Sequence, residues 1–480
     1  QAEDGIRDLV RSRGLGDVYK RQVFLSNNVV ANDLSVAKFH EWLFENGHTE
    51  YVNIEQSPGC KKLIQKHGLK VPKVGLFDEP KVKTNEWFWL ECDEFQATNN
   101  LKIKFYDGWI PEKNVKPNYG TLVYELFRFN ERPFKVQRVE KYEVEPSSNP
   151  YRFRSSLKED KYLDKQLKKT ALLSYLRFED GQITVDKMSP KDRFGKFFNN
   201  ETKLRSMSVG ETMTSYVAGH AICEGYIGSI NSKLNDWPLI ENTLYYDQEF
   251  INLLNMQAGD NKYVWSSDFL IPTNLYGADD HVHDIEAYMS EFKNSKKGKS
   301  EFNYSALSTQ LILNYVLFKT GEDFEKILEK TFKENAKIKH SVFFYKASRS
   351  SKEKGNANIM FYATRYDYLR IAKAMLDDWQ NDTCVGKYLK TIFENRISKD
   401  NDKKDRRGDK TQWSFARGYA GQFQAHYKGI DKKRAVMGMH GYGGQHVVID
   451  FERSRIVVTN ALHENFNYKK IVYDPIKKGK

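Results

Sequence analysis

The sequence is poor in cysteine and lacks a long apolar run, and each shortage excludes a class of protein. Four of the 480 residues are cysteine, and Cys60, Cys92, Cys223 and Cys384 lie far apart with no CxxC pair. Four scattered cysteines without a CxxC pair support neither a disulfide framework nor a zinc ribbon. No apolar run approaches the roughly 18 residues that a membrane-spanning helix requires, so no span is predicted.

Several catalytic motifs are also missing. The chain has no GxSxG elbow of the α/β-hydrolase type and no phosphate-binding GxxxxGK[ST] loop. His40 and Glu41 begin no HExxH zinc motif. The glycine run Gly441–Gly444 precedes a β-prone segment instead of a helix, which excludes a dinucleotide-binding loop.

The composition predicts a globular protein with a basic surface. Hydrophobic residues make up 40% of the chain and aromatic residues 14%, which is enough for a folded core. The formal net charge is +12, but 76 basic residues are scattered among 64 acidic ones. The basic stretches Lys293–Lys299 and Lys399–Lys410 lack interleaved aromatic side chains that would stack nucleobases. We therefore expect a solvated surface and no nucleic-acid partner.

The first third of the chain carries no motif that indicates a function. Residues 1–22 are charge-dense and resemble the translation of a sequencing adapter, so we interpret them as a disordered artefact. The natural N-terminus would then lie upstream, and the sequence assigns no compartment. Residues 23–160 are predicted to form a mixed α/β extension of unknown role, with a helix over 34–45 and extended segments over 69–77 and 86–92.

From residue 161 onward the apolar periodicity predicts a regular domain. A strand hairpin is expected first, over residues 171–178 and 182–186. Helices follow, one starting at residue 208 and others over 309–319, 322–334 and 366–378. The last part of the domain is predicted to be a run of strands over 419–427, 434–439, 446–451 and 455–460. This order predicts a sheet assembled from both ends of the domain around a helical insertion.

Ser208 stands at the start of the helix that follows Arg205, and its position allows two interpretations. A serine at a helix N-terminus caps the helix when its side-chain oxygen accepts a backbone N–H. It can instead act as a nucleophile, because the helix dipole and free N–H groups stabilise negative charge beside the hydroxyl. Taken alone, the position favours capping.

Four segments together resemble one family. They are Arg205–Ile227 (RSMSVGETMTSYVAGHAICEGYI), Leu253–Gly259 (LLNMQAG), Phe302–Gln310 (FNYSALSTQ) and Gly441–Gln445 (GYGGQ). In this order and approximate spacing they resemble the β-lactamase-related serine hydrolases, the group of class C β-lactamases, family VIII esterases and 6-aminohexanoate-oligomer hydrolases. The resemblance implies an α/β fold of the α+β type over residues 161–475, an antiparallel sheet flanked by helices with a helical subdomain.

The resemblance also implies roles for individual residues. Ser208 would be the acyl-accepting nucleophile, Tyr304 the general base or proton relay, and the N–H groups of Ser208 and Tyr442 the oxyanion hole. The strand positions that bind substrate would be His440, Gly441, Gly443 and Gly444, and His440 becomes a site residue if the register shifts by one or two positions. The implied substrate is a small ester, amide or β-lactam-like molecule, with no metal or organic cofactor; the oligomeric state is not indicated.

The chain departs from the family pattern at Glu211. The family carries Ser-x-x-Lys on this helix, whereas Glu211 stands three residues after Ser208. A carboxylate, with a reference pKa of about 4.3 against about 10.4 for lysine, is a much weaker base. Its negative charge would also raise the pKa of the Tyr304 phenol. Three explanations stay open: a silenced binding or regulatory protein, a rewired site in which Glu211 is the base, and an error in the sequence.

A metal-dependent alternative rests on Asp279–Asp284 (DDHVHD). Asp280, His281 and His283 are residue types that bind zinc, and alternate residues of a strand share one face. No third, separated ligand is identifiable in the sequence. We therefore favour a polar loop and keep a metal-dependent hydrolase as the more distant hypothesis.

Overall fold

The structure is a computed structural model that describes four long segments and one short strand pair. These are residues 141–264, 285–346, 357–399 and 415–478, with strands at 87–90 and 103–106. The chain divides into two compact units, Gln1–Arg138 and Val139–Lys480. In the first unit, β1 (Trp87–Leu90) pairs antiparallel with β2 (Ile103–Tyr106), which confirms the extended segment predicted at 86–92. The helix predicted at 34–45 and the segment at 69–77 lie outside the described residues.

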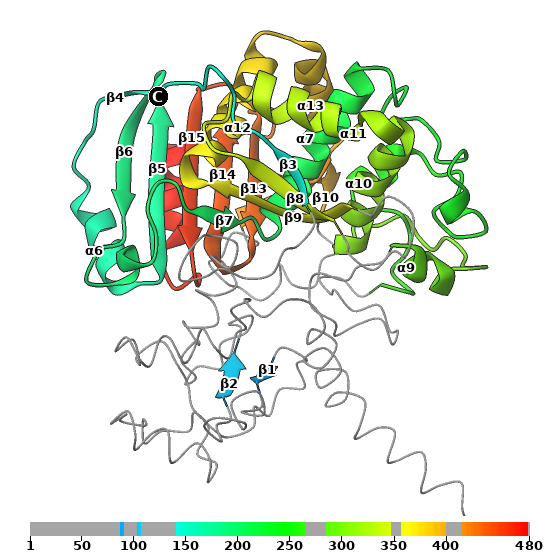
Figure 1. The fold of residues 1–480 in the computed structure, drawn as a ribbon, viewed down its shortest axis with the longest axis horizontal. Helices are drawn as coiled ribbons and strands as arrows, with labels where there is room; N and C mark the ends of the chain where they lie inside the picture. Colours follow the sequence, from blue (N-terminus) through cyan, green and yellow to red (C-terminus); the bar gives the residue numbers. More distant parts are fainter. Residues whose placement is uncertain are drawn as a thin grey trace, which may run out of the picture. The chain divides into compact units, whose positions relative to one another are not determined.

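The second unit is built on a large sheet whose nine described strands run in the order β10-β11-β12-β13-β14-β15-β5-β6-β4. The strands are β4 (Arg154–Ser155), β5 (Leu172–Glu179), β6 (Gln182–Met188), β10 (Ile397–Ser398), β11 (Ala416–Ala420), β12 (Phe423–Tyr427), β13 (Val436–Gly441), β14 (Gln445–Asp450) and β15 (Arg455–Ala461). Strand β5 lies beside β15, with Phe178 opposite Ile456 (Figure 1). The sheet is therefore assembled from both ends of the unit, as the element order predicts.

The hairpin of β5 and β6 forms where the sequence predicts it. Asp180 and Gly181 connect the strands with φ of 51° and 77°, the left-handed pair that a tight hairpin turn requires. Leu172–Leu176 is buried at every position, so β5 is covered on both faces.

A second sheet of four described strands, in the order β3-β8-β9-β7, packs against helix α7 (Val209–Cys223). Its strands are β3 (Lys141–Val144), β7 (Lys203–Arg205), β8 (Val342–Lys346) and β9 (Ala357–Thr364). Residues 141–160, grouped with the extension in the sequence, contribute β3 to this sheet and β4 to the large one. All eight residues of β9 are buried, so β9 forms part of the core.

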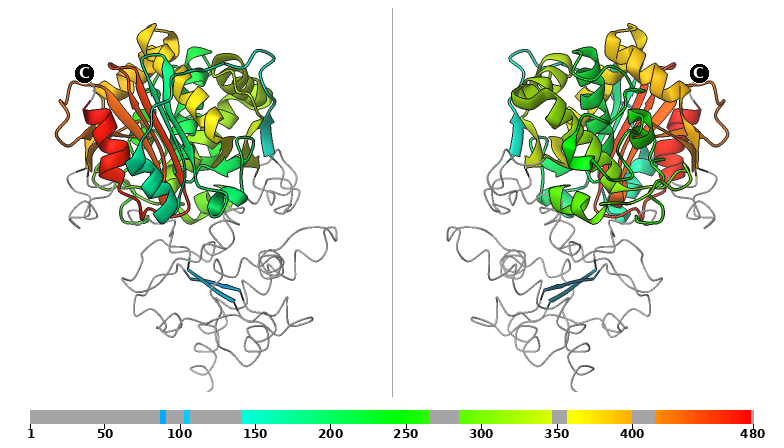
Figure 2. Two further views of the ribbon diagram at one scale, coloured as in Figure 1. Left: turned by 90° about the vertical axis from the view of Figure 1, so that its left-hand side faces the viewer. Right: turned by 90° about the vertical axis from the view of Figure 1, so that its right-hand side faces the viewer.

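Helices cover both faces of the large sheet. The described α-helices of the second unit are α6 (Lys161–Lys169), α7 (Val209–Cys223), α8 (Phe250–Leu254), α9 (Ile285–Glu291), α10 (Ala306–Thr320), α11 (Phe324–Leu328), α12 (Arg365–Gln380), α13 (Cys384–Glu394) and α15 (Asp474–Lys477). Figure 2 shows the sheet edge-on, with α6 and α15 on one face and α7, α12 and α13 on the other. Helices α10 and α11 pack against α7 and the second sheet, and α8 and α9 pack against α10. Among the described residues, no helix combines the length and apolar character needed to cross a membrane.

Two predicted elements have a different form in the structure. The strand predicted over 419–427 is wrong, because Gly421 and Gln422 have φ of 54° and 73° and turn the chain into the hairpin of β11 and β12. The helix predicted over 322–334 is divided into a 3-10 turn, α11 and a π-helical segment at Glu329–Asn335. In both places the backbone conformation changes although the apolar residues of the sequence continue without interruption, so the sequence pattern does not reveal the change.

A disulfide joins two helices of the second unit, contrary to the expectation from the cysteine spacing. Cys223 at the end of α7 is bonded to Cys384, the first residue of α13, across a sequence separation of 161 residues. Spacing rules detect clustered cysteines, and this pair meets only because the fold brings the two helix ends together.

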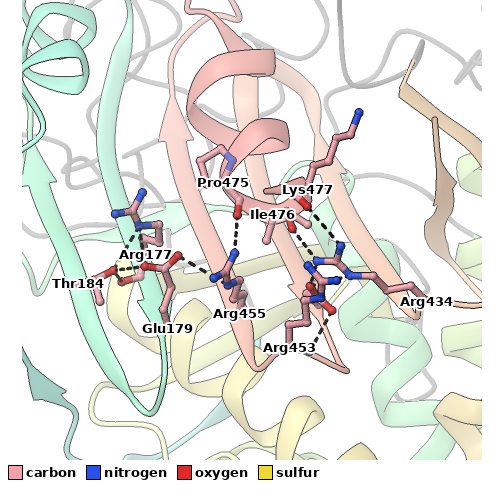
Figure 3. Close-up of polar contacts among 10 residues, drawn as sticks. Arg177, Glu179, Thr184, Arg434, Arg453, Arg455, Pro475, Ile476 and Lys477 are labelled. Atoms are coloured by element: carbon pink, nitrogen blue, oxygen red, sulfur yellow. Dashed lines mark hydrogen bonds and ion pairs between the residues drawn. The ribbon is translucent and has the colours of Figure 1, made fainter. Parts of the chain in front are cut away.

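Two arginines anchor the short C-terminal helix α15 to the end of the sheet (Figure 3). Arg455 donates to the carbonyl of Pro475 at 3.1 Å, and Arg434 donates to the carbonyl of Ile476 at 2.8 Å. Carbonyls at the end of a helix have no partner within it. The two guanidinium groups satisfy them, while Arg434 is paired with the buried carboxylate of Asp450.

Candidate active site

The hydroxyl of Ser208 is not used for capping, so the capping interpretation of its position does not hold. Ser208 is the N-cap residue of α7, yet its side chain makes no capping hydrogen bond. Met207 before it has φ of 48°, a left-handed conformation that is strained for a side-chain-bearing residue. Ser206 fixes the turn, because its backbone N–H donates to the carbonyl of Phe361 on β9 and its hydroxyl accepts from the N–H of Phe361.

The glycine strand lies against this turn. A Cβ atom added at Gly441 would lie 2.5 Å from the Ser206 carbonyl oxygen and 3.1 Å from the Met207 Cβ. Only a residue without a side chain fits so close to the backbone. The end of β13 and the start of α7, about 230 residues apart in the sequence, are thereby in direct contact.

We predict that Gly441→Ala destabilises the fold by about 1–3 kcal/mol, because the added methyl group overlaps the Ser206 carbonyl. The free energy of unfolding in urea measures the effect. Gly228→Ala is the matched control, since a Cβ there meets only the Ser232 hydroxyl, at 3.0 Å. Equal stability of the two variants would contradict the close approach of β13 to the turn.

Glu211 lies in the first turn of α7, and three hydroxyl groups surround its carboxylate. Its Oε1 accepts a hydrogen bond from the Tyr304 phenol, and its Oε2 accepts one from the Tyr419 phenol at 3.2 Å. The Ser208 hydroxyl lies close enough to Glu211 and to Tyr304 to donate a hydrogen bond to the ionised form of each, and it acts to lower the pKa of both. Ser208, Glu211 and Tyr304 therefore form one connected cluster.

Tyr304 is held in place by its neighbour Asn303. The Asn303 amide donates to the carboxylate of Asp260 at 2.8 Å, and its backbone N–H donates to the carbonyl of Met256 at 2.8 Å. The Met256 side chain packs in one cluster with Tyr304. Segments 253–259 and 302–310, which carry the family resemblance, are thus in contact with each other at the site.

Burial dominates the electrostatics of the cluster. Glu211 is 4% exposed, and burial raises its pKa to about 7, although the hydrogen bonds from Tyr304, Ser208 and Tyr419 act in the opposite direction. Burial and the neighbouring charge of Glu211 raise the pKa of Tyr304 well above its usual value. Near neutral pH the carboxyl group is therefore divided between its two protonation states, and the phenol is neutral.

This fold has counterparts among solved protein structures. A protein described as a 6-aminohexanoate-dimer hydrolase from Bacillus anthracis superposes with a TM-score of 0.54 at 15% identity, covering 76% of this chain and 98% of its own. This chain has the β-lactamase-like fold. Comparisons with protein-family models and with curated protein sequences found no match.

Two further structures with the β-lactamase-like fold are more distant. A protein described as a β-lactamase from Bacteroides dorei has a TM-score of 0.46 at 13% identity, with 64% of this chain and 90% of its own covered. FmtA from Staphylococcus aureus has a TM-score of 0.45 at 17% identity, with coverage of 70% and 94%. The superposition on the Bacillus anthracis protein confirms the fold predicted from the four segments.

The candidate residues on and after strand β13 of this β-lactamase-like chain do not all lie together. Tyr442, Gly443 and Gly444 form the turn after β13, where the glycines have φ of 74° and 99° and face Leu462 and Phe466. His440 is directed elsewhere: its Nε2 lies 2.6 Å from the Tyr427 hydroxyl and its Nδ1 lies 2.9 Å from Nδ1 of His446. The register that makes His440 a site residue is therefore not supported by its contacts.

The described residues offer no cluster of ligands for the metal-dependent hypothesis. In the described ranges, no three histidine, cysteine or acidic side chains lie close enough together to hold a metal ion. Asp280, His281 and His283 lie outside these ranges.

Tyr419 is a member of the site that sequence reasoning missed. It lies on β11, and its hydroxyl contacts Glu211 directly. The sequence places it in a strand without any motif around it. No sequence signal distinguishes it from the other tyrosines of the chain, because only the pairing of strands brings β11 to α7.

Proposed function

We propose that this chain is a serine hydrolase that cleaves a small ester, amide or β-lactam-like substrate through an acyl-enzyme on Ser208. The observation that carries the proposal is the cluster of Ser208, Tyr304 and Glu211, with the Gly441 strand packed against the same turn. A nucleophile within hydrogen-bonding reach of a proton acceptor is the arrangement that acyl transfer needs. The fold of a hydrolase from Bacillus anthracis supports it.

In the proposed reaction, the Ser208 oxygen bonds to the acyl carbon, and the bond from that carbon to the leaving group breaks. The Ser208 proton passes to ionised Glu211, directly or through Tyr304, and then to the leaving group. Water hydrolyses the acyl-enzyme and restores the hydroxyl. A base with a pKa of about 7 is suited to this transfer near neutral pH. The backbone N–H groups of Ser208 and Tyr442 would hold the oxyanion.

The negative charge of Glu211 is expected to make the reaction slow. Ionised Glu211 lies beside the hydroxyl on which the oxyanion develops, and like charges repel strongly in a dry site. This observation favours a second candidate function, a binding or regulatory protein on the same scaffold that is silenced by Glu211. The two candidates differ in whether Ser208 becomes acylated.

Labelling with a fluorophosphonate probe tests the proposal. We expect one covalent adduct per chain, located at Ser208 by mass spectrometry of peptides, and no adduct in Ser208→Ala. Ser215→Ala is a matched control, because Ser215 lies on the same helix with its hydroxyl bonded to Tyr388 and to the Gly421 carbonyl. A folded chain that neither this probe nor penicillin labels would refute the hydrolase function and favour the silenced protein.

A further inference from the structure

Tyr419 gives the Glu211 carboxylate a second phenol. Tyr304 donates to one carboxylate oxygen and Tyr419 to the other, so each oxygen accepts a separate hydroxyl group. The two tyrosines come from unrelated parts of the chain, the segment before α10 and strand β11. A carboxylate held at both oxygens cannot rotate away from the nucleophile without losing a buried hydrogen bond.

The phenol of Tyr419 is fixed in place by its surroundings. The side chain is 1% exposed, and its ring lies 5.0 Å from the ring of Phe302. The turn after β11 is tied to α7, because the Thr212 hydroxyl donates to the carbonyl of Gln422 at 2.5 Å. Thr212 is the residue after Glu211, so this bond fixes β11 at the level of the carboxylate.

Among the described residues, the side chains that counter the effect of burial on the Glu211 carboxylate are all hydroxyl-bearing. Tyr304 and Tyr419 are the titratable groups that face it, and Ser208 is the third hydrogen-bonding partner. No lysine, arginine or histidine of the described segments is among the causes that shift its pKa. The position of Glu211 in the first turn of α7 adds the helix dipole, which favours a negative charge there.

We propose that Tyr419 is a positioning residue of the site, whose hydroxyl holds the Glu211 carboxylate against Ser208 and Tyr304 and stabilises its ionised form. Tyr419 thereby sets the pH at which Glu211 becomes able to accept the Ser208 proton. The contact between Tyr419 and Glu211 stands by itself, and its consequence for catalysis rests on the proposed hydrolase function.

Infrared difference titration of Tyr419→Phe tests the contact without any need for activity. The carbonyl band of the protonated Glu211 side chain, assigned by its loss in Glu211→Gln, gives the titration midpoint. Because a hydrogen bond donated to the ionised form is removed, we expect the midpoint in Tyr419→Phe to rise by about one pH unit. The phenylalanine ring keeps the packing against Phe302.

Tyr388→Phe is the matched control. Tyr388 is also buried, and its hydroxyl bonds Ser215, which lies one helical turn after Glu211 on α7. Its loss is expected to leave the Glu211 midpoint unchanged. An unmoved midpoint in Tyr419→Phe, or an equal shift in both variants, would overturn the proposal.

The pH profile of Ser208 labelling separates this inference from the proposed function. If both hold, the labelling midpoint moves upward in Tyr419→Phe together with the infrared midpoint. An infrared shift in a protein that no probe labels supports the positioning role on Glu211 and overturns the hydrolase function. If Ser208 is labelled but neither the infrared midpoint nor the labelling midpoint moves in Tyr419→Phe, the result supports the hydrolase function and overturns the role of Tyr419.

Discussion

Replacing Glu211 by lysine is expected to raise the hydrolysis rate of a chromogenic short-chain ester by roughly tenfold or more. The substitution restores the Ser-x-x-Lys pattern of the family that the chain resembles. An ammonium group at this place lowers the pKa of the Tyr304 phenol and offsets the charge of the developing oxyanion, whereas ionised Glu211 opposes both. Initial rates at pH 8, where Glu211 is mostly ionised, measure the gain.

The surroundings of Glu211 suit a lysine as well as a carboxylate. Its three hydrogen-bonding partners among the described residues are the hydroxyls of Ser208, Tyr304 and Tyr419. Hydroxyl oxygens accept as well as donate hydrogen bonds, so each can turn its lone pairs toward the three N–H donors of an ammonium group. The variant is therefore expected to remain folded, which a thermal melt followed by circular dichroism checks.

Glu211→Gln separates the two electrostatic effects. Glutamine removes the negative charge but supplies neither a base nor a cation, so we expect it to remain well below Glu211→Lys. Equal rates in the two variants would mean that the gain comes from loss of the carboxylate alone. A rate in folded Glu211→Lys no higher than that of the natural chain would refute the role assigned to position 211.

Loss of the Cys223–Cys384 disulfide is expected to lower the free energy of unfolding by about 5 kcal/mol, according to the chain-entropy estimate for a loop of this length. The bond closes a loop across 161 residues that contains α8 to α12, and it ties the end of α7 to α13. Without it, the unfolded chain gains the conformational freedom of the whole loop. Urea unfolding of Cys223→Ser/Cys384→Ser measures the change.

A reducing agent provides the matched control. Dithiothreitol is expected to destabilise the natural chain to about the level of the double variant and to leave the double variant unchanged. Cys384 is exposed and Cys223 is partly exposed, so the reductant can reach the bond. Peptide mapping under non-reducing conditions that finds the two cysteines unlinked, with no effect of reductant on the natural chain, would contradict the bond.

The sequence predicts the site through local signals and fails where contacts are long-range. Ser208 and Tyr304 are recognisable because each stands in a segment with its own pattern, and the hairpin of β5 and β6 is recognisable from its alternation and its Asp180-Gly181 turn. Tyr419 lies in a segment whose apolar pattern predicts one continuous strand. The turn at Gly421 moves it into a hairpin that packs against α7.

The sequence by itself determined the order of the elements, the family-like segments and the replacement at Glu211, because each is a property of neighbouring residues. Only the tertiary structure decided that the Ser208 hydroxyl faces Glu211 and Tyr304 instead of capping α7, and that Gly441 packs against its turn. It alone also brought Tyr419 to Glu211 and Cys223 to Cys384. Contacts across some 90 to 230 residues depend on how sheets and helices pack in space, which no local periodicity encodes.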